Sequence, residues 1–153
     1  MPKVGDKAPN FKIPDQKGEV RSLADFKGQN VLIYFYPKDF TSGCTTEACS
    51  LRDMFPKFDE QSAVILGVSA DTVESHKKFA AKYKLPFTLL ADPDKIMINA
   101  YGIWQKKKFL GKEYMGIART SFLIDKKGKI AKIYNNVKPP VHAEQVYKDI
   151  QGL

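Results

Sequence analysis

A run of six apolar residues, 31–36, is bounded by Asn30 and Pro37. Continuous hydrophobicity over the length of one strand predicts a strand that is buried on both faces, in the middle of a sheet. A second run, Ala63–Ser69, has the same character. Because a sheet covered on both faces needs helices between its parallel strands, these two runs restrict the chain to the α/β class.

The remaining segments alternate between strand and helix patterns, and hairpin patterns near both ends make the predicted sheet mixed, with helices on both faces. The predicted elements are an N-terminal β-hairpin (11–13 and 19–21), helices at 45–59, 72–83, 95–101 and 141–150, a strand at 88–91, and a second hairpin (120–124 and 129–134). Pro56 is expected to kink the first helix or end it early. Thr72 or Asp71 is expected to cap the N-terminus of the second predicted helix.

The length of 153 residues suits one compact domain, 1–153. The net charge of +8 comes from 22 lysines and three arginines, with one lysine cluster at 106–108. Arginine is the usual reader of bases and phosphates, so a lysine-coated surface is favoured over a nucleic-acid partner. No apolar run is long enough to cross a membrane, and the first residues lack a signal-peptide core, so a cytoplasmic location is expected.

The only two cysteines, Cys44 and Cys49, follow the predicted central strand. Pro37, Thr41 and Cys44 are spaced as P-x3-T-x2-C. A thiol at the start of a helix lies where free N–H groups and the helix dipole favour the thiolate, which is the nucleophilic form. The position also lies at the carboxyl end of a central strand, where binding and catalytic residues are commonly found in such sheets. The pattern predicts cysteine redox chemistry.

A thiol that cleaves peroxide needs hydrogen-bond donors and a cation as well as a thiolate. Thr41 can offer a hydroxyl, and Pro37 can wall the pocket against water. Arg119, at the start of a predicted strand, is the candidate cation. Glu47 either matches the helix dipole or orients Arg119.

Each of these residues also has an ordinary structural interpretation. The cysteine could be a small buried hydrophobic residue, the threonine a helix cap, the proline a strand terminator and Arg119 a surface charge. Arg52, on the same predicted helix as the cysteines, is an alternative cation with a weaker claim.

The separation of Cys44 and Cys49 adds a geometric constraint. On a regular helix, five residues place their Cα atoms roughly 8.6 Å apart, whereas a disulfide requires roughly 4.4–6.8 Å. The two thiols can bond only if the first turns of the helix unravel, which would couple redox chemistry to local unfolding. The alternative is that Cys49 only packs in the core.

Other site classes fit the sequence less well. A zinc site needs about four ligands, whereas the chain has two cysteines and two distant histidines, His76 and His142. A thioredoxin-type reductase expects C-x-x-C rather than C-x4-C. A cysteine–histidine hydrolase would need His76 to reach Cys44. No glycine-rich phosphate loop is present. We therefore expect neither a metal nor another cofactor.

The chain resembles the peroxiredoxins, and most closely the bacterioferritin-comigratory or peroxiredoxin Q class. The resemblance spans nearly the whole chain and rests on VGDKAP at 4–9, YPKD at 36–39, Thr41, GCTTEAC at 43–49, YGIW at 101–104, YMGI at 114–117, Arg119 and FLID at 122–125. Two positions depart from the class pattern. Ser42 stands where proline is usual, and Ser121 where threonine is common.

The resemblance implies a thioredoxin-like fold and a thiol-dependent peroxidase acting on hydrogen peroxide and organic hydroperoxides. Cys44 would be the peroxidatic cysteine and Cys49 the resolving cysteine, forming an intramolecular disulfide that thioredoxin or a similar dithiol protein reduces. Pro37, Thr41 and Arg119 match the family's pocket residues. A monomer is expected. The alternatives from other classes are a redox-sensing module that uses the same two cysteines and, on charge alone, a nucleic-acid-binding protein.

Overall fold

A five-stranded mixed sheet forms the centre of the computed structural model, which describes residues 1–153 apart from the side chain of Pro140. The strand order is β5-β4-β3-β8-β9. The central strand β3 (Asn30–Phe35) is parallel to β4 (Ala63–Ser69) and antiparallel to β8 (Thr120–Ile124). β5 (Thr88–Ala91) and β9 (Ile130–Tyr134) form the two edges. The predicted thioredoxin-like, mixed α/β architecture is confirmed.

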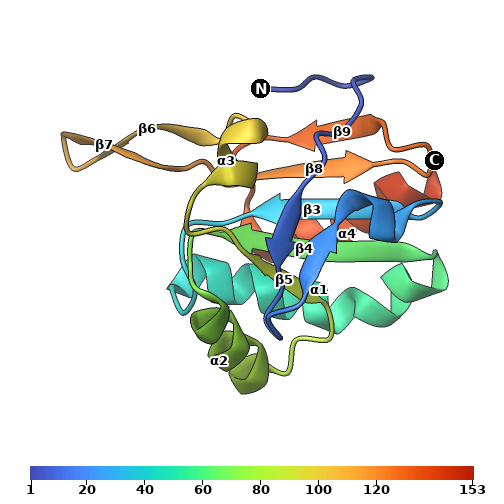
Figure 1. The fold of residues 1–153 in the computed structure, drawn as a ribbon, viewed down its shortest axis with the longest axis horizontal. Helices are drawn as coiled ribbons and strands as arrows, with labels where there is room; N and C mark the ends of the chain where they lie inside the picture. The colour runs from blue at the N-terminus through green and yellow to red at the C-terminus, as the bar shows by residue number, and fades with distance from the viewer.

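The two faces of the sheet carry separate apolar clusters, as the alternation of side chains along β3 requires. Leu32 and Tyr34 pack with α1 (Ser42–Glu60), α2 (Val73–Tyr83) and α4 (Pro139–Gln151). The opposite face packs against α3 (Ile96–Ala100) and the N-terminal segment, which passes in front of the sheet in Figure 1. That segment contains the predicted hairpin, β1 (Lys12–Pro14) and β2 (Val20–Ser22), and a short 3-10 helix at Leu23–Phe26.

The first helix differs from its predicted bounds at both ends. α1 begins at Ser42, so that Cys44 lies inside it, and it runs through the exposed Pro56 to Glu60. A proline inside a helix costs about 3 kcal/mol. Leu51 and Phe58, which flank Pro56, are fully buried in the core. Their packing accounts for the continuation of a helix that the proline was expected to kink or shorten. The capping prediction for α2 is correct, because Thr72 Oγ1 accepts from the Ser75 amide.

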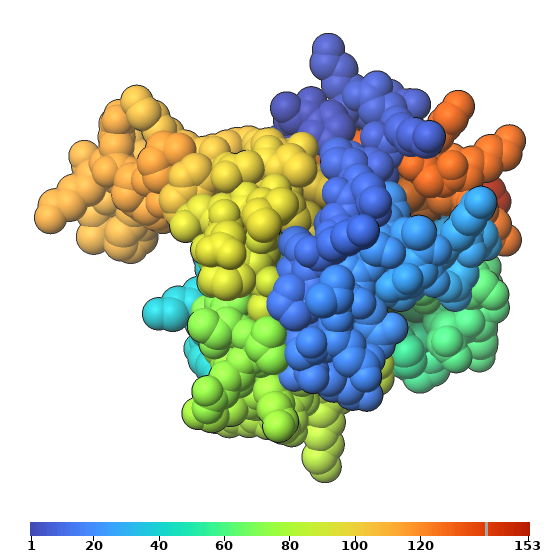
Figure 2. All heavy atoms as spheres, in the orientation of Figure 1, coloured from blue at the N-terminus to red at the C-terminus, as the bar shows by residue number. Residues whose placement is uncertain are grey.

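One element was not predicted. β6 (Trp104–Phe109) and β7 (Lys112–Ile117) form a separate two-stranded hairpin, and we refer to this hairpin, residues 104–117, as the arm. The arm projects beyond the edge of the sheet where β3 ends and α1 begins (Figure 1), and stands away from the body of the molecule in Figure 2. Leu110 and Gly111 both have positive φ at its tip, which is typical of a tight hairpin turn. Its strands, of which β6 is rich in lysine, lack the apolar alternation that marks a half-buried strand.

None of the helices in the described chain is long and apolar enough to cross a membrane.

Candidate active site

Cys44 is the third residue of α1, which begins just after the loop that follows β3. Its side chain is buried among Tyr34, Tyr36 and Ala48 in the core cluster under the helix. The first turn of a helix has amide groups without intrahelical acceptors, and its dipole favours a negative charge. The prediction that the thiol lies at the start of a helix is therefore correct.

Arg119 reaches this thiol from just before the start of β8, the strand next to β3 in the sheet. Its Nη2 atom lies 3.1 Å from Cys44 Sγ, and its Nη1 atom donates to Glu47 Oε1 at 2.9 Å. The planar guanidinium thus holds two groups of α1 that are one turn apart. A Cβ atom at Gly43 would lie 3.2 Å from Arg119 Nη2. The absence of a side chain at position 43 therefore leaves room for the arginine beside the sulfur.

Glu47 faces Arg119 from a buried position. Burial raises the pKa of the Glu47 carboxyl to about 7, and the nearby Arg119 guanidinium opposes that rise. Oε1 is bound by Arg119, whereas Oε2 has no hydrogen-bond partner among the described residues. The contact supports an orienting position for Glu47, which was one of the two sequence interpretations. A carboxyl of this kind changes its charge near neutral pH.

Thr41 and Pro37 lie in the loop before the helix. Thr41 is the residue before the first turn, but its hydroxyl does not cap the helix; it donates instead to the Lys38 carbonyl at 2.8 Å. The hydroxyl proton is thereby directed back into the loop, and the oxygen lone pairs remain free to accept. Pro37 is half-buried at the end of β3. No hydrogen bond joins Thr41 Oγ1 to Cys44 Sγ in the part of the chain described.

The same loop is held by residues that the sequence did not identify. The Asp39 carboxylate is buried, accepts from the Tyr36 hydroxyl at 2.6 Å and from the Ser75 hydroxyl at 2.9 Å, and lies 2.7 Å from His76 Nδ1. The Asp39 amide donates to Asp71 Oδ2 at 2.8 Å. The loop that carries Thr41 is therefore fastened to α2 and to the end of β4.

His76 is consequently not a partner of the thiol. Its Nε2 atom bonds the Leu90 carbonyl at 2.9 Å and its Nδ1 atom faces Asp39. Atoms of Asp39, Asp71 and His76 do lie within 4.8 Å of one another, a spacing that could suit a metal. These atoms already bind one another and nearby hydroxyls, as Ser69 does for Asp71, so the cluster is a hydrogen-bonded anchor.

The other two arginines lie in different places. Arg52, the alternative cation, donates to the Tyr83 carbonyl at 2.8 Å and pairs with Asp53. Arg21 pairs with the buried Asp15 in the N-terminal hairpin. Of the three arginines, Arg119 alone contacts Cys44 in the described structure.

Cys49 lies one to two turns along the same uninterrupted helix. Both thiols are free, Cys44 buried and Cys49 half-buried. A continuous helix keeps Cα atoms five positions apart at roughly 8.6 Å, beyond the span of a disulfide of about 4.4–6.8 Å. The structure thus represents a form in which the two sulfurs cannot bond, as the spacing predicted.

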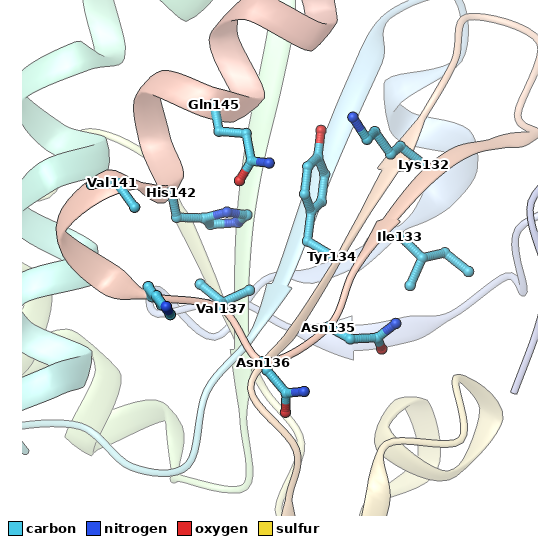
Figure 3. A pocket seen from close by; sticks show the side chains of 10 residues that line it. Lys132, Ile133, Tyr134, Asn135, Asn136, Val137, Val141, His142 and Gln145 are labelled. Atoms are coloured by element: carbon cyan, nitrogen blue, oxygen red, sulfur yellow. The ribbon is translucent and has the colours of Figure 1, made fainter.

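A pocket of about 340 Å³ lies between β9 and the start of α4 (Figure 3). His142, Tyr134 and Gln145 line it, while neither Cys44 nor Arg119 does. His142 Nε2 lies 2.8 Å from Ser121 Oγ, and burial lowers the pKa of this imidazole to about 4. A neutral, buried histidine thus joins α4 to β8.

Comparison with known proteins places this geometry in a family. The family model described as "AhpC/TSA family" matches residues 4–133. Peroxiredoxin Bcp of Bacillus subtilis is 45% identical over 98% of this chain and 96% of its own. Peroxiredoxin Bcp of Escherichia coli K12 is 47% identical over 94% of this chain and 92% of its own. The chain belongs to the AhpC/TSA family of peroxiredoxins.

A solved structure agrees with the sequence relatives. The bacterioferritin comigratory protein of Xanthomonas campestris, described for its alkyl peroxide reduction activity, superposes with a TM-score of 0.88. It is 35% identical, over 93% of this chain and 90% of its own. The resemblance to the Bcp and peroxiredoxin Q class is thereby confirmed, and this peroxiredoxin is a thiol-dependent peroxidase that uses a peroxide and a thiol reductant.

Proposed function

We propose that Cys44 is the peroxidatic cysteine and that Arg119 is the cation that supports its reaction. The contact between Arg119 Nη2 and Cys44 Sγ, 3.1 Å, carries this proposal. The Cys44 thiolate attacks the proton-bearing peroxide oxygen, an S–O bond forms as the O–O bond breaks, and the sulfur is oxidised to a sulfenic acid. The other oxygen is the leaving group, and it takes up a proton to give an alcohol or water. Arg119 stabilises the negative charge that develops on the oxygens.

Thr41 and Pro37 shape the loop side of the same pocket in this proposal. The Thr41 hydroxyl donates to the Lys38 carbonyl, so its oxygen can accept a hydrogen bond from the proton-bearing peroxide oxygen. Pro37 excludes water at the loop entrance. Glu47 holds the Arg119 fork in position through Nη1. Both hydrogen peroxide and organic hydroperoxides are substrates of the proposed site.

The second half of the cycle uses Cys49. Its thiol attacks the Cys44 sulfenic acid, forming the disulfide and releasing water. The continuous helix between the two residues must open first. Thioredoxin or a similar dithiol protein then reduces the disulfide by two electrons. The half-buried position of Cys49 supports this role, because a resolving thiol has to be reachable once the helix opens.

The test is peroxide consumption with thioredoxin and its reductase, measured for the wild type and both cysteine variants. Cys44→Ser is expected to lose turnover, and full activity in that variant would refute the assignment. Cys49→Ser is expected to react once with peroxide and to recycle poorly. Mass spectrometry of the oxidised wild type is expected to show loss of two hydrogens. Finding only Cys44 sulfinic acid would exclude Cys49 as the resolving residue.

The setting of the enzyme is part of the same proposal. We propose that residues 1–153 act as one domain, as a monomer, and in the cytoplasm. Two free thiols that must be returned to the reduced state by a dithiol protein suit a reducing compartment. No role in binding nucleic acid or a membrane is proposed. Size-exclusion chromatography with light scattering tests the monomer in both the reduced and the disulfide form.

A further inference from the structure

The arm brings a second cation to the active site, and this cation is Lys107. Side chains along a strand alternate between its two faces. In the cluster of three lysines on β6, Lys106 and Lys108 are exposed, whereas Lys107 is half-buried. The lysine cluster is thus divided, with its middle member turned towards the body of the protein and its neighbours towards solvent.

The neighbouring strand gives the Lys107 stem its direction. A Cβ atom at Gly116 would lie 3.1 Å from Lys107 Cδ, so the stem crosses β7 where that strand has no side chain. The φ of Gly116 is not positive, and the glycine therefore supplies space rather than an unusual backbone conformation. Beyond it, Lys107 Nζ donates to the Ile117 carbonyl at 3.0 Å. Ile117 is separated by one residue from Arg119, at the base of the arm.

This position puts the ammonium within electrostatic reach of the reacting groups. Burial lowers the pKa of Lys107, the Arg119 guanidinium lowers it further, and Cys44 acts in the opposite direction. Among the described residues, the Ile117 carbonyl is the one acceptor bound to Nζ. An ammonium has three donors, so two remain for a group that enters the site.

The charged groups of the site leave Lys107 free to bind a negatively charged group of the substrate. The two outer nitrogens of Arg119 are already engaged by Cys44 and Glu47. A negative charge on the substrate, apart from the reacting oxygens, would therefore meet Lys107 first. We propose that Lys107 is a specificity-determining residue of the peroxidase, which favours organic hydroperoxides that carry a carboxylate. The proposal rests on the peroxidase function and adds a preference among its substrates.

The test compares linoleic acid hydroperoxide with its methyl ester, each below the concentration at which it forms micelles. The two probes differ in one negative charge. Lys107→Met is expected to lower the ratio of kcat/KM for the acid to that for the ester about fivefold, the size expected of one charge pair about 4 Å apart in water. Lys107→Arg is expected to retain the ratio, and added salt to reduce it in the wild type.

Matched variants on the same strand provide the control. Lys106→Met and Lys108→Met remove one charge each from the exposed face of β6 and are expected to leave the ratio unchanged. Gly116→Ala, which displaces the Lys107 stem without removing its charge, is expected to lower the ratio as Lys107→Met does.

Three results would overturn the inference. They are an unchanged ratio in Lys107→Met, an equal fall in all three lysine variants, and an equal loss of rate on both probes. A wild type that consumes hydrogen peroxide but not the acid probe would likewise overturn the inference, whereas a wild type that consumes neither hydrogen peroxide nor either probe would contradict the peroxidase function itself, so the two failures are distinguishable.

Discussion

Arg119 Nη2 lies 3.1 Å from Cys44 Sγ although the two residues are 75 positions apart in the sequence. Arg119 precedes β8, Cys44 opens the helix after β3, and these two strands are direct neighbours in the sheet. The antiparallel pairing of Phe35 with Thr120 brings the end of one strand next to the start of the other. The sheet therefore assembles the thiol and its cation without any local sequence signal joining them.

Loss of this cation is expected to slow the peroxide step. Arg119→Met keeps an apolar stem but removes the donors that face Cys44 and Glu47, so the developing negative charge loses its support. The second-order rate of Cys44 oxidation is expected to fall about 10²-fold, as when other electrostatic donors are removed. Stopped-flow fluorescence measures it. Arg52→Met, whose guanidinium binds Tyr83 and Asp53 instead, is the control; equal losses in both variants would contradict the assignment.

The buried Glu47 is expected to make stability depend on pH. Its folded pKa of about 7 lies above the ordinary value of 4.5, so the folded state binds more protons than the unfolded state between these values. The free energy of unfolding contributed by this carboxyl is complete below about pH 4.5 and is lost as the pH rises through about 7. At about 1.4 kcal/mol per pKa unit, the loss has an upper bound of about 3.5 kcal/mol.

Glu47→Gln isolates this effect because glutamine keeps the shape and does not titrate. The difference in unfolding free energy between the variant and the wild type, from urea denaturation of the reduced proteins, is expected to shift in favour of the variant as the pH rises through the same window. Other titrating groups cancel in that difference. Curves that remain parallel from acid to neutral pH would show that Glu47 does not titrate there.

The sequence predicted those parts of the fold whose burial shows directly as a run of apolar residues. The apolar runs of β3 and β4 were predicted as central strands, and both strands lie in the interior of the sheet. The arm was missed because its strands are stabilised by pairing with each other and leave Phe109 and Leu110 exposed, so no apolar pattern marks them. Long-range pairing of polar strands leaves little trace in local sequence.

The site shows the same division. The sequence predicted that Cys44 lies at a helix start and named Arg119, at the start of a predicted strand, as the candidate cation, which the resemblance to the family then matched. The buried anchor of Asp39 and His76 had no comparable signal, since its members are 37 positions apart and meet only when α2 packs against the loop. Lys107 was visible only as one member of a lysine cluster. Its neighbours could not be told apart from it until the strand fixed which face each lysine occupies.

The start of α1 is expected to control how fast the disulfide forms. Ser42 is the first helical residue, where proline is favoured because its φ suits the helix and no intrahelical N–H bond is lost. Thr41 is already extended, with φ −79 and ψ 153, as the residue before a proline must be. Ser42→Pro is expected to stabilise the closed helix by about 0.4–1 kcal/mol.

The disulfide is then expected to form about twofold to fivefold more slowly, because a gain of that size shifts the opening equilibrium by that factor. More of Cys44 should be driven to sulfinic acid at high peroxide. Quenched-flow mass spectrometry measures both products. A disulfide rate equal to that of the wild type would show that opening of this turn does not limit resolution.

The contact between His76 and Asp39 is expected to stabilise the loop that carries Thr41. Both side chains are buried and their closest atoms are 2.7 Å apart, so loss of His76 leaves the buried Asp39 carboxylate with only its two hydroxyl partners, Tyr36 and Ser75. His76→Leu is expected to cost about 1–3 kcal/mol of unfolding free energy, against little for Lys77→Ala on the exposed side of α2. In a double-mutant cycle with Asp39→Asn, the two losses are expected to fall well short of additive. Full additivity would mean that the two residues stabilise the fold independently, and the anchor would then have to be assigned to Asp71 and Tyr36 instead.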